Sequence, residues 1–170
     1  MISSAIGHLI ELSLPTEIDK RKGKWSLQDL PVIPEDFQLK PIAKTENRYR
    51  LLCRLMERQD VDEVVNACDA GREGELIFRY LIKLAGIKKP LRRLWLQSMT
   101  SDAIRSAFAH LRSDREMIPL AEAAVCRSES DWLVGINATR AFDRLHEFKD
   151  GWFPTDPRWP GADANAGNPG

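Results

Sequence analysis

Residues 62–86 read DEVVNACDAGREGELIFRYLIKLAG, and this stretch decides the fold. Its first seven residues are two acids followed by the mainly apolar run VVNAC, and they predict a buried strand over 62–68. Gly71 and Gly74 mark a turn after the strand, and apolar residues then recur at helical spacing as far as Gly86, a typical helix stop. The sequence therefore predicts a strand, an acidic loop and a helix in direct succession.

The segments on either side repeat this alternation. A helix is predicted over about 46–58 with Thr45 as its N-cap, and a second strand over 91–96. Thr100 is the predicted cap of a further helix that carries Ile104, Phe108 and Leu111. Strands that alternate with helices at this spacing are typical of an α/β fold with a parallel sheet.

The two ends of the chain differ from this centre. Residues 1–14 predict one short strand with its turn, and the charge- and proline-rich residues 15–44 predict an irregular excursion. One long helical pattern covers 117–142, and Gly135 predicts a bend or an end within it. Prolines, glycines and few large apolar residues predict a disordered tail at the C-terminal end.

The composition is that of an ordinary soluble globular protein, with 43% hydrophobic and 29% charged residues. Basic and acidic residues number 25 each, so net charge gives no general attraction to nucleic acid or membrane. Cys53, Cys68 and Cys126 are widely spaced, which argues against a disulfide framework or a zinc site. Because no apolar run has membrane-span length and the start lacks a basic region, we expect a cytoplasmic protein with no membrane partner.

The acidic loop holds the candidate chemistry. Asp69 and Glu73 follow the predicted strand, and ligands of open α/β sheets gather outside the carboxyl ends of strands. Two carboxylates suit Mg²⁺, which binds to few protein carboxylates and shares them with phosphate. Arg72 offers a guanidinium to a phosphate, as the following helix N-terminus offers N–H groups. A second interpretation stays open on these residues alone: the acids stabilise the helix dipole and Arg72 is solvated.

Other residues carry weaker signals. Arg127 and Asp131 stand at i and i+4, so they form a surface salt bridge, or Asp131 orients Arg127 toward a DNA phosphate. Trp132 is expected in the core rather than as a platform for bases, and His8 is expected to be a hydrogen-bonded histidine near a strand end. Two basic clusters are expected to be solvated faces, namely Arg48, Arg50, Arg54 and Arg58, and Lys88, Lys89, Arg92 and Arg93.

The glycine spacing of the loop fits neither a Walker A nor a Rossmann motif. Residues 69–77, DAGREGELI, instead resemble the second acidic motif of the Toprim domain in bacterial topoisomerase III, a type IA DNA topoisomerase. GHLIEL (7–12) and KWSLQDLP (24–31) are similar to segments that precede this motif in the family. CRSESDWLVGINATRAF (126–142) resembles the helix that leads from Toprim into the DNA-gripping domain. The resemblance covers about residues 5–142, and these segments together distinguish the chain from primases and Toprim nucleases.

The resemblance implies a partial Toprim domain over residues 1–115, the start of the central DNA-binding region over 116–149, and a disordered tail over 150–170. It implies that Asp69 and Glu73 hold Mg²⁺ near the scissile phosphate, where a metal ion offsets charge on the phosphoryl centre. The family's reaction is a transesterification. A tyrosine attacks a single-strand phosphodiester, another strand passes through the gap, and the break is resealed.

The chain departs from the family pattern in three places. Gly71 stands where many type IA enzymes carry another acid, which implies weaker metal binding. The family's first Toprim strand, with its glutamate, would precede Ile2, and the nucleophilic tyrosine would follow Phe142; neither is among these 170 residues. No catalytic residue is therefore assigned. The residues implied to lie near bound DNA are Arg72, Arg127 and Asp131.

These departures predict a fragment, truncated at both ends, that binds single-stranded DNA and does not relax DNA alone. The remaining parts of the enzyme, supplied by another chain, are a candidate partner. The absent first strand predicts an incomplete sheet with an unpaired edge. Two alternatives stay open: a module that binds single-stranded DNA or a partner without catalysis, and a metal-dependent Toprim nuclease.

Overall fold

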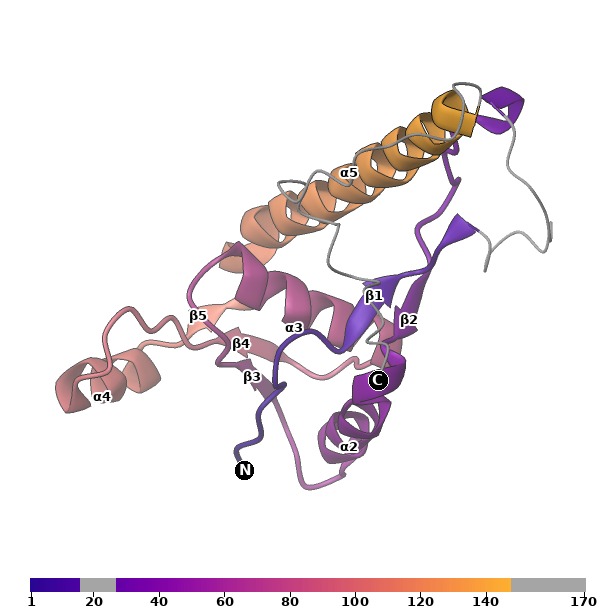
Figure 1. Ribbon diagram of the computed structural model, residues 1–170. Coiled ribbons are helices and arrows are strands. Elements are labelled where there is room, and N and C mark those ends of the chain that lie inside the picture. Colours follow the sequence, from indigo (N-terminus) through magenta and orange to yellow (C-terminus); the bar gives the residue numbers. More distant parts are fainter. Residues whose placement is uncertain (16–26, 148–170) are drawn as a thin grey trace, which may run out of the picture.

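The computed structural model describes residues 1–15 and 27–147 of the 170-residue chain, and Figure 1 shows their arrangement. The central sheet has three strands in the order β3-β4-β5. β3 and β4 are parallel, and β5 is antiparallel to β4. The strands are β3 (Val64–Asn66), β4 (Leu91–Arg93) and β5 (Arg112–Ser113).

The predicted α/β class, a sheet flanked by helices, is confirmed, but the expectation of a wholly parallel sheet is wrong for β5. The reason lies in the connection between β4 and β5. A parallel neighbour would need a crossover that returns the chain to the start of β4. The chain instead leaves the end of β4, forms α4 (Ser101–Ala109) beyond the sheet, and re-enters beside β4 in the opposite direction. Within the described residues, β3 is an edge strand that pairs with β4 alone.

A separate two-stranded sheet lies beside the first. β1 (Ile10–Leu12) pairs antiparallel with β2 (Leu39–Pro41), and a short 3₁₀ turn, η1 (Leu27–Asp29), lies between them in the chain. The strand expected in residues 1–14 is thus confirmed. Its partner comes from the stretch predicted to be irregular. The pairing is extended by bonds from Ser13 N to Gln38 O at 2.8 Å and from Ile42 N to Leu9 O at 2.9 Å.

The predicted helices are present with nearly the predicted bounds, as α2 (Glu46–Glu57), α3 (Arg72–Ala85) and α4. Gly86 ends α3 in the left-handed conformation, with φ of 66°. Thr100 caps α4 by accepting a hydrogen bond from Ala103 N at 3.3 Å. The predicted cap at Thr45 is not formed by its side chain, because a 3₁₀ turn, η2 (Ala43–Thr45), precedes α2 and the hydroxyl faces the carbonyl oxygens of His8 and Ile42.

The last described element is α5 (Asp114–Glu147), a helix of 34 residues that continues through Gly135. The predicted bend or end at Gly135 is therefore wrong. A glycine costs about 1 kcal/mol in a helix interior, which is too little by itself to end a helix of 34 residues. α5 packs on α3 and also contacts β4 and β5 (Figure 1). The predicted tail over 150–170 lies outside the described residues, and no described helix is long and apolar enough to span a membrane.

The hydrophobic core lies around α3. Side chains from β1, α2, α3 and α5 meet there, and most of them are apolar. This packing fixes the N-terminal end of α3, and with it the acidic loop that precedes the helix. The buried members of the cluster are Leu9, Ile10, Leu52, Met56, Leu76, Tyr80, Leu81 and Ala124.

Candidate metal and nucleic-acid site

The acidic loop folds back onto the first turn of α3. Gly74 is buried there, and a Cβ atom at this position would lie 2.2 Å from the carbonyl oxygen of Asp69 and 2.9 Å from its nitrogen. Glycine is therefore required for this approach of loop and helix. Gly71 differs, since its backbone is extended, with φ of 174°, and a Cβ atom there would meet nothing within 4 Å.

A buried arginine holds the loop from below. Arg93, at the end of β4, is 1% exposed. Its Nη1 donates to the carbonyl oxygens of Asn66 at 3.0 Å and Cys68 at 2.7 Å, and its Nη2 donates to that of Asp69 at 2.6 Å. One guanidinium thus fixes the backbone from the last residue of β3 to the candidate metal ligand. The guanidinium also lies 5.2 Å from the ring centre of Trp95.

Glu75 completes this buried cluster and is also 1% exposed. Its Oε1 accepts a bond from Arg79 Nε at 2.8 Å, and its Oε2 accepts one from Asn66 Nδ2 at 3.1 Å. Arg93 Nε lies 3.5 Å from the same Oε2, a charge contact without hydrogen-bond geometry. Arg79 continues the chain of contacts to Asp114 Oδ1 at 2.6 Å, at the start of α5. Asn66, Glu75, Arg79 and Arg93 are called the buried charge cluster below.

The sequence analysis missed the role of this cluster. Arg93 was expected on a solvated basic face, and that expectation is wrong. Strand residues alternate between two faces, so Arg92 is exposed while Arg93 points inward. The two-residue alternation of a strand could have indicated this burial, because the apolar residue Leu91 lies two positions before Arg93 and on the same face. Burial also raises the pKa of the Cys68 thiol.

The other side of the loop faces solvent. Asp69, Arg72 and Glu73, all predicted site residues, are exposed there. Glu73 Oε1 lies 2.5 Å from His8 Nε2, so the histidine near the start of β1 is in contact with a carboxylate. Within residues 1–15 and 27–147, no group of three or more His, Cys, Asp or Glu side chains could hold a metal ion. Two carboxylates still fit Mg²⁺, because this ion binds to one or two carboxylates and completes its shell with water and phosphate.

The two predicted DNA-side residues of α5 form the expected pair. Arg127 Nε lies 3.5 Å from Asp131 Oδ2, and both side chains are more than 60% exposed, at 63% and 68%. Trp132, next in the chain, packs edge-on against Phe37 with the ring centres 5.5 Å apart. It is half-buried, in agreement with a packing role.

A cleft of about 390 Å³ adjoins the acidic loop between β1 and α5. Two of its lining residues carry buried polar atoms, Tyr80 Oη and Trp132 Nε1, that have no hydrogen-bond partner among the described residues. Burial raises the pKa of Tyr80, and the nearby Ser128 side chain partly opposes this shift. His8 belongs both to this cleft and to the contact with Glu73. Residues that line the cleft include His8, Glu11, Leu76, Tyr80, Ser128 and Trp132.

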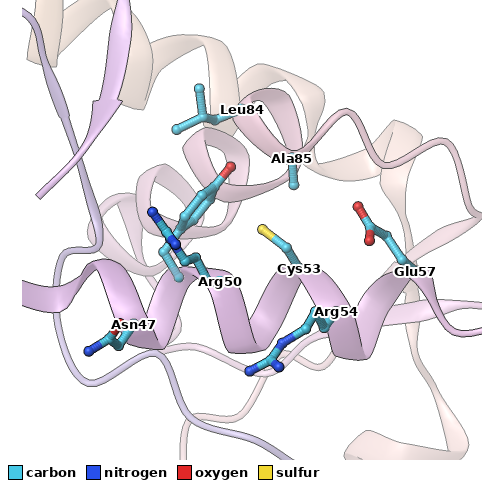
Figure 2. Close-up of a pocket in the computed structure, with 8 residues that line it drawn as sticks. Asn47, Arg50, Cys53, Arg54, Glu57, Leu84 and Ala85 are labelled. Carbon is cyan, nitrogen blue, oxygen red and sulfur yellow. The ribbon is translucent and has the colours of Figure 1, made fainter.

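A larger hollow of about 720 Å³ lies elsewhere, between α2 and the C-terminal end of α3. Figure 2 shows Cys53 pointing from α2 toward Ala85 of α3 across it. Tyr49 also lines it, and burial with a hydrogen bond to Cys53 raises the pKa of Tyr49 to about 12. Because the acidic loop is at the opposite end of α3, this hollow is not part of the candidate site.

Comparison with known proteins gives relatives but no matching family model. The DNA topoisomerase 3 of Bacillus subtilis is 45% identical over 141 residues, which cover 83% of this chain and 19% of that protein. The DNA topoisomerase 3 of Staphylococcus haemolyticus is 45% identical over 147 residues, or 86% of this chain and 21% of that protein. That of Bacillus licheniformis is 44% identical over 141 residues. The chain thus spans about a fifth of the length of the curated relatives it matches.

Proposed function

We infer a function from the premise that this chain belongs to the bacterial DNA topoisomerase III family, of which it spans about one fifth. We propose that it is the Toprim segment of a type IA enzyme that cuts and rejoins one DNA strand. Its task is to hold a divalent cation and a single DNA strand. The observation that carries this proposal is the acidic loop, whose backbone is fixed by buried Arg93 while Asp69 and Glu73 stay exposed.

In this proposal Asp69 and Glu73 hold Mg²⁺. When bound, the ion neutralises charge that develops on the scissile phosphate. The loop supports this role in two ways. Asp69 lies on a backbone segment that Arg93 anchors, and Glu73 lies in the first turn of α3. Both carboxylates are therefore at one helix N-terminus, which is a favourable place for a phosphate. Arg72, exposed between them in the chain, is suited to contact a phosphate oxygen.

The cleft between β1 and α5 is proposed to receive one nucleotide of a single strand. Its volume of about 390 Å³ lies within the range of small-ligand sites. An unpaired base can stack on aromatic side chains, and Trp132 is one of the residues that line this cleft. Arg127 lies next to Ser128 of this cleft on α5, so it is available to a neighbouring phosphate while Asp131 fixes its orientation.

We further propose that these residues do not supply the nucleophile. The sequence holds two tyrosines, Tyr49 and Tyr80. The Tyr80 side chain is 5% exposed in the core, and Tyr49 lies at the far end of α3 from the loop with a pKa raised to about 12. Neither hydroxyl is suited to attack a phosphodiester held at Asp69 and Glu73. The chain alone is therefore expected to bind single-stranded DNA with Mg²⁺ and not to relax supercoils.

The test combines a supercoil relaxation assay with titration of a labelled single-stranded oligonucleotide. We expect no relaxation, and binding that Mg²⁺ strengthens in the wild type but not in Asp69→Ala or Glu73→Ala. Relaxation by the purified chain would show that the nucleophile is present after all. Nicking of plasmid with Mg²⁺ or Mn²⁺ would instead identify a nuclease. Binding that depends on Arg127 but not on Asp69 would identify a DNA-binding module without a metal role.

A further inference from the structure

We propose that His8 is a positioning residue for Glu73, holding one carboxylate oxygen so that the other is presented to a divalent cation. The inference rests on the proposed metal role of Asp69 and Glu73. It adds a residue from the β1 segment to a site otherwise built from the loop and α3. Metal-bound carboxylates are commonly held by hydrogen bonds of this kind, which set the orientation of the ligand.

Among the described residues, the Glu73 side chain forms its ion-pair contact with His8. His8 Nε2 lies 2.5 Å from Glu73 Oε1, and the glutamate side chain is 69% exposed. An exposed glutamate without a partner samples many rotamers, and binding an ion would require it to lose that freedom. His8 removes part of this cost beforehand. Oε2 makes no hydrogen bond or ion pair within the described part of the chain, so it is left for the ion.

The backbone that carries His8 is anchored on both sides. Before it, Arg48 Nε donates to Ser4 O at 2.6 Å, and Arg48 Nη2 donates to Ser4 Oγ at 3.0 Å. After it, Leu9 is 2% exposed in the core and its carbonyl oxygen accepts from Ile42 N at 2.9 Å. His8 is thus attached to the same core that holds α3.

A kink between the two anchors turns His8 toward the loop. Ile6 and Gly7 have φ of 58° and 76°, both in the left-handed region. This conformation is unfavourable for a β-branched residue, and Ile6 gains little from packing because it is 71% exposed. Such a backbone persists where its surroundings over-determine it, and these outliers gather at functional sites. Here the kink leads directly into the histidine that contacts Glu73.

The experiment measures Mn²⁺ binding to the full chain by electron paramagnetic resonance, without DNA. His8→Ala is expected to weaken binding by about 10- to 100-fold, the usual effect of losing a residue that orients a ligand. His8→Gln should stay near the wild type, because its amide nitrogen reaches the place of Nε2. His8→Asn is the matched control, since its shorter amide reaches only the place of Nδ1 and should behave like alanine. Thermal melting should be similar for all three variants, because His8 is exposed.

The outcomes separate the two proposals. If the wild type binds Mn²⁺ more tightly than Asp69→Ala but His8→Ala binds like the wild type, the metal site stands and the role of His8 is overturned. Tighter binding by His8→Ala would show that His8 competes with the ion, which also overturns it. If the wild type binds no better than Asp69→Ala, the proposed metal site fails and the inference fails with it. Equal losses in His8→Gln and His8→Ala would contradict the hydrogen-bond account.

Discussion

The acidic loop has two sides that carry similar charged residues in opposite environments. Below it, Glu75 and Arg93 are each 1% exposed, and their partners are protein atoms. Above it, Asp69 and Glu73 are exposed. Buried charges are tolerated where they are paired and hydrogen-bonded, and they then fix a geometry. Exposed charges contribute little to stability and stay available to a ligand. The lower side therefore fixes the shape of the loop, and the upper side carries the carboxylates that are proposed to bind a metal ion.

The sharpest way to separate the two sides is to remove one carboxylate from each. Glu75→Ala should destabilise the chain by about 3–5 kcal/mol, because it leaves the buried Arg93 and the partly buried Arg79 without their shared carboxylate. Glu73→Ala, two residues earlier on the same turn, should change stability by no more than about 0.5 kcal/mol. Urea denaturation followed by circular dichroism measures both. Similar losses in the two variants would remove the distinction between the sides.

The two glycines of the loop give a second, smaller contrast. Gly74→Ala should cost about 1–3 kcal/mol, since its Cβ atom would lie 2.2 Å from Asp69 O and the backbone would have to move. Gly71→Ala should stabilise the chain by about 0.4–1 kcal/mol, because alanine accepts the extended backbone and restricts the unfolded chain. The same denaturation experiment decides. A tolerated Gly74→Ala would mean that the loop is not pressed against α3.

The open space at Gly71 also allows the exposed side to be strengthened. Gly71→Asp places a third carboxylate between Asp69 and Glu73 in the chain, and no atom within 4 Å opposes its Cβ atom. Ligand charge count tunes the affinity of cation sites, so Mg²⁺ and Mn²⁺ should bind about tenfold more tightly. Isothermal titration calorimetry measures the change, with Gly71→Asn as the uncharged control. An equal gain in Gly71→Asn would show that charge is not the cause.

The parts of this site that the sequence predicted are those that depend on neighbours in the chain. The strand, the loop and α3 follow from apolar spacing and from glycines, and the Gly86 stop and the Thr100 cap are equally local. The contact between His8 and Glu73 could not be predicted in this way. It requires the pairing of β1 with β2 and a kink at Ile6 that no propensity indicates.

The buried charge cluster escaped the sequence analysis for the same reason. Arg93 is paired with Asn66 only through the parallel register of β3 and β4, which joins residues 27 positions apart. In the sequence Arg93 is the last of several basic residues and resembles a surface residue. β2 was missed because its pairing with β1 is also long-range and its last residue is a proline. The error at Gly135 has the opposite origin, since a local cost of about 1 kcal/mol is too small by itself to interrupt a helix of 34 residues.

The smallest expected effect on stability is at the exposed pair of α5. Asp131→Ala should cost no more than about 1 kcal/mol, since Arg127 and Asp131 are exposed and Arg127 Nε lies 3.5 Å from Asp131 Oδ2. Arg127→Ala should be equally mild for folding but should weaken binding to single-stranded DNA. If Arg127 contacts one phosphate, the slope of log K against log salt should become shallower by about 0.7. Arg105→Ala, which removes an exposed arginine of α4, is the matched control and should leave that slope unchanged. A slope that responds equally to both variants would mean that α5 attracts DNA by general charge rather than by a contact at Arg127.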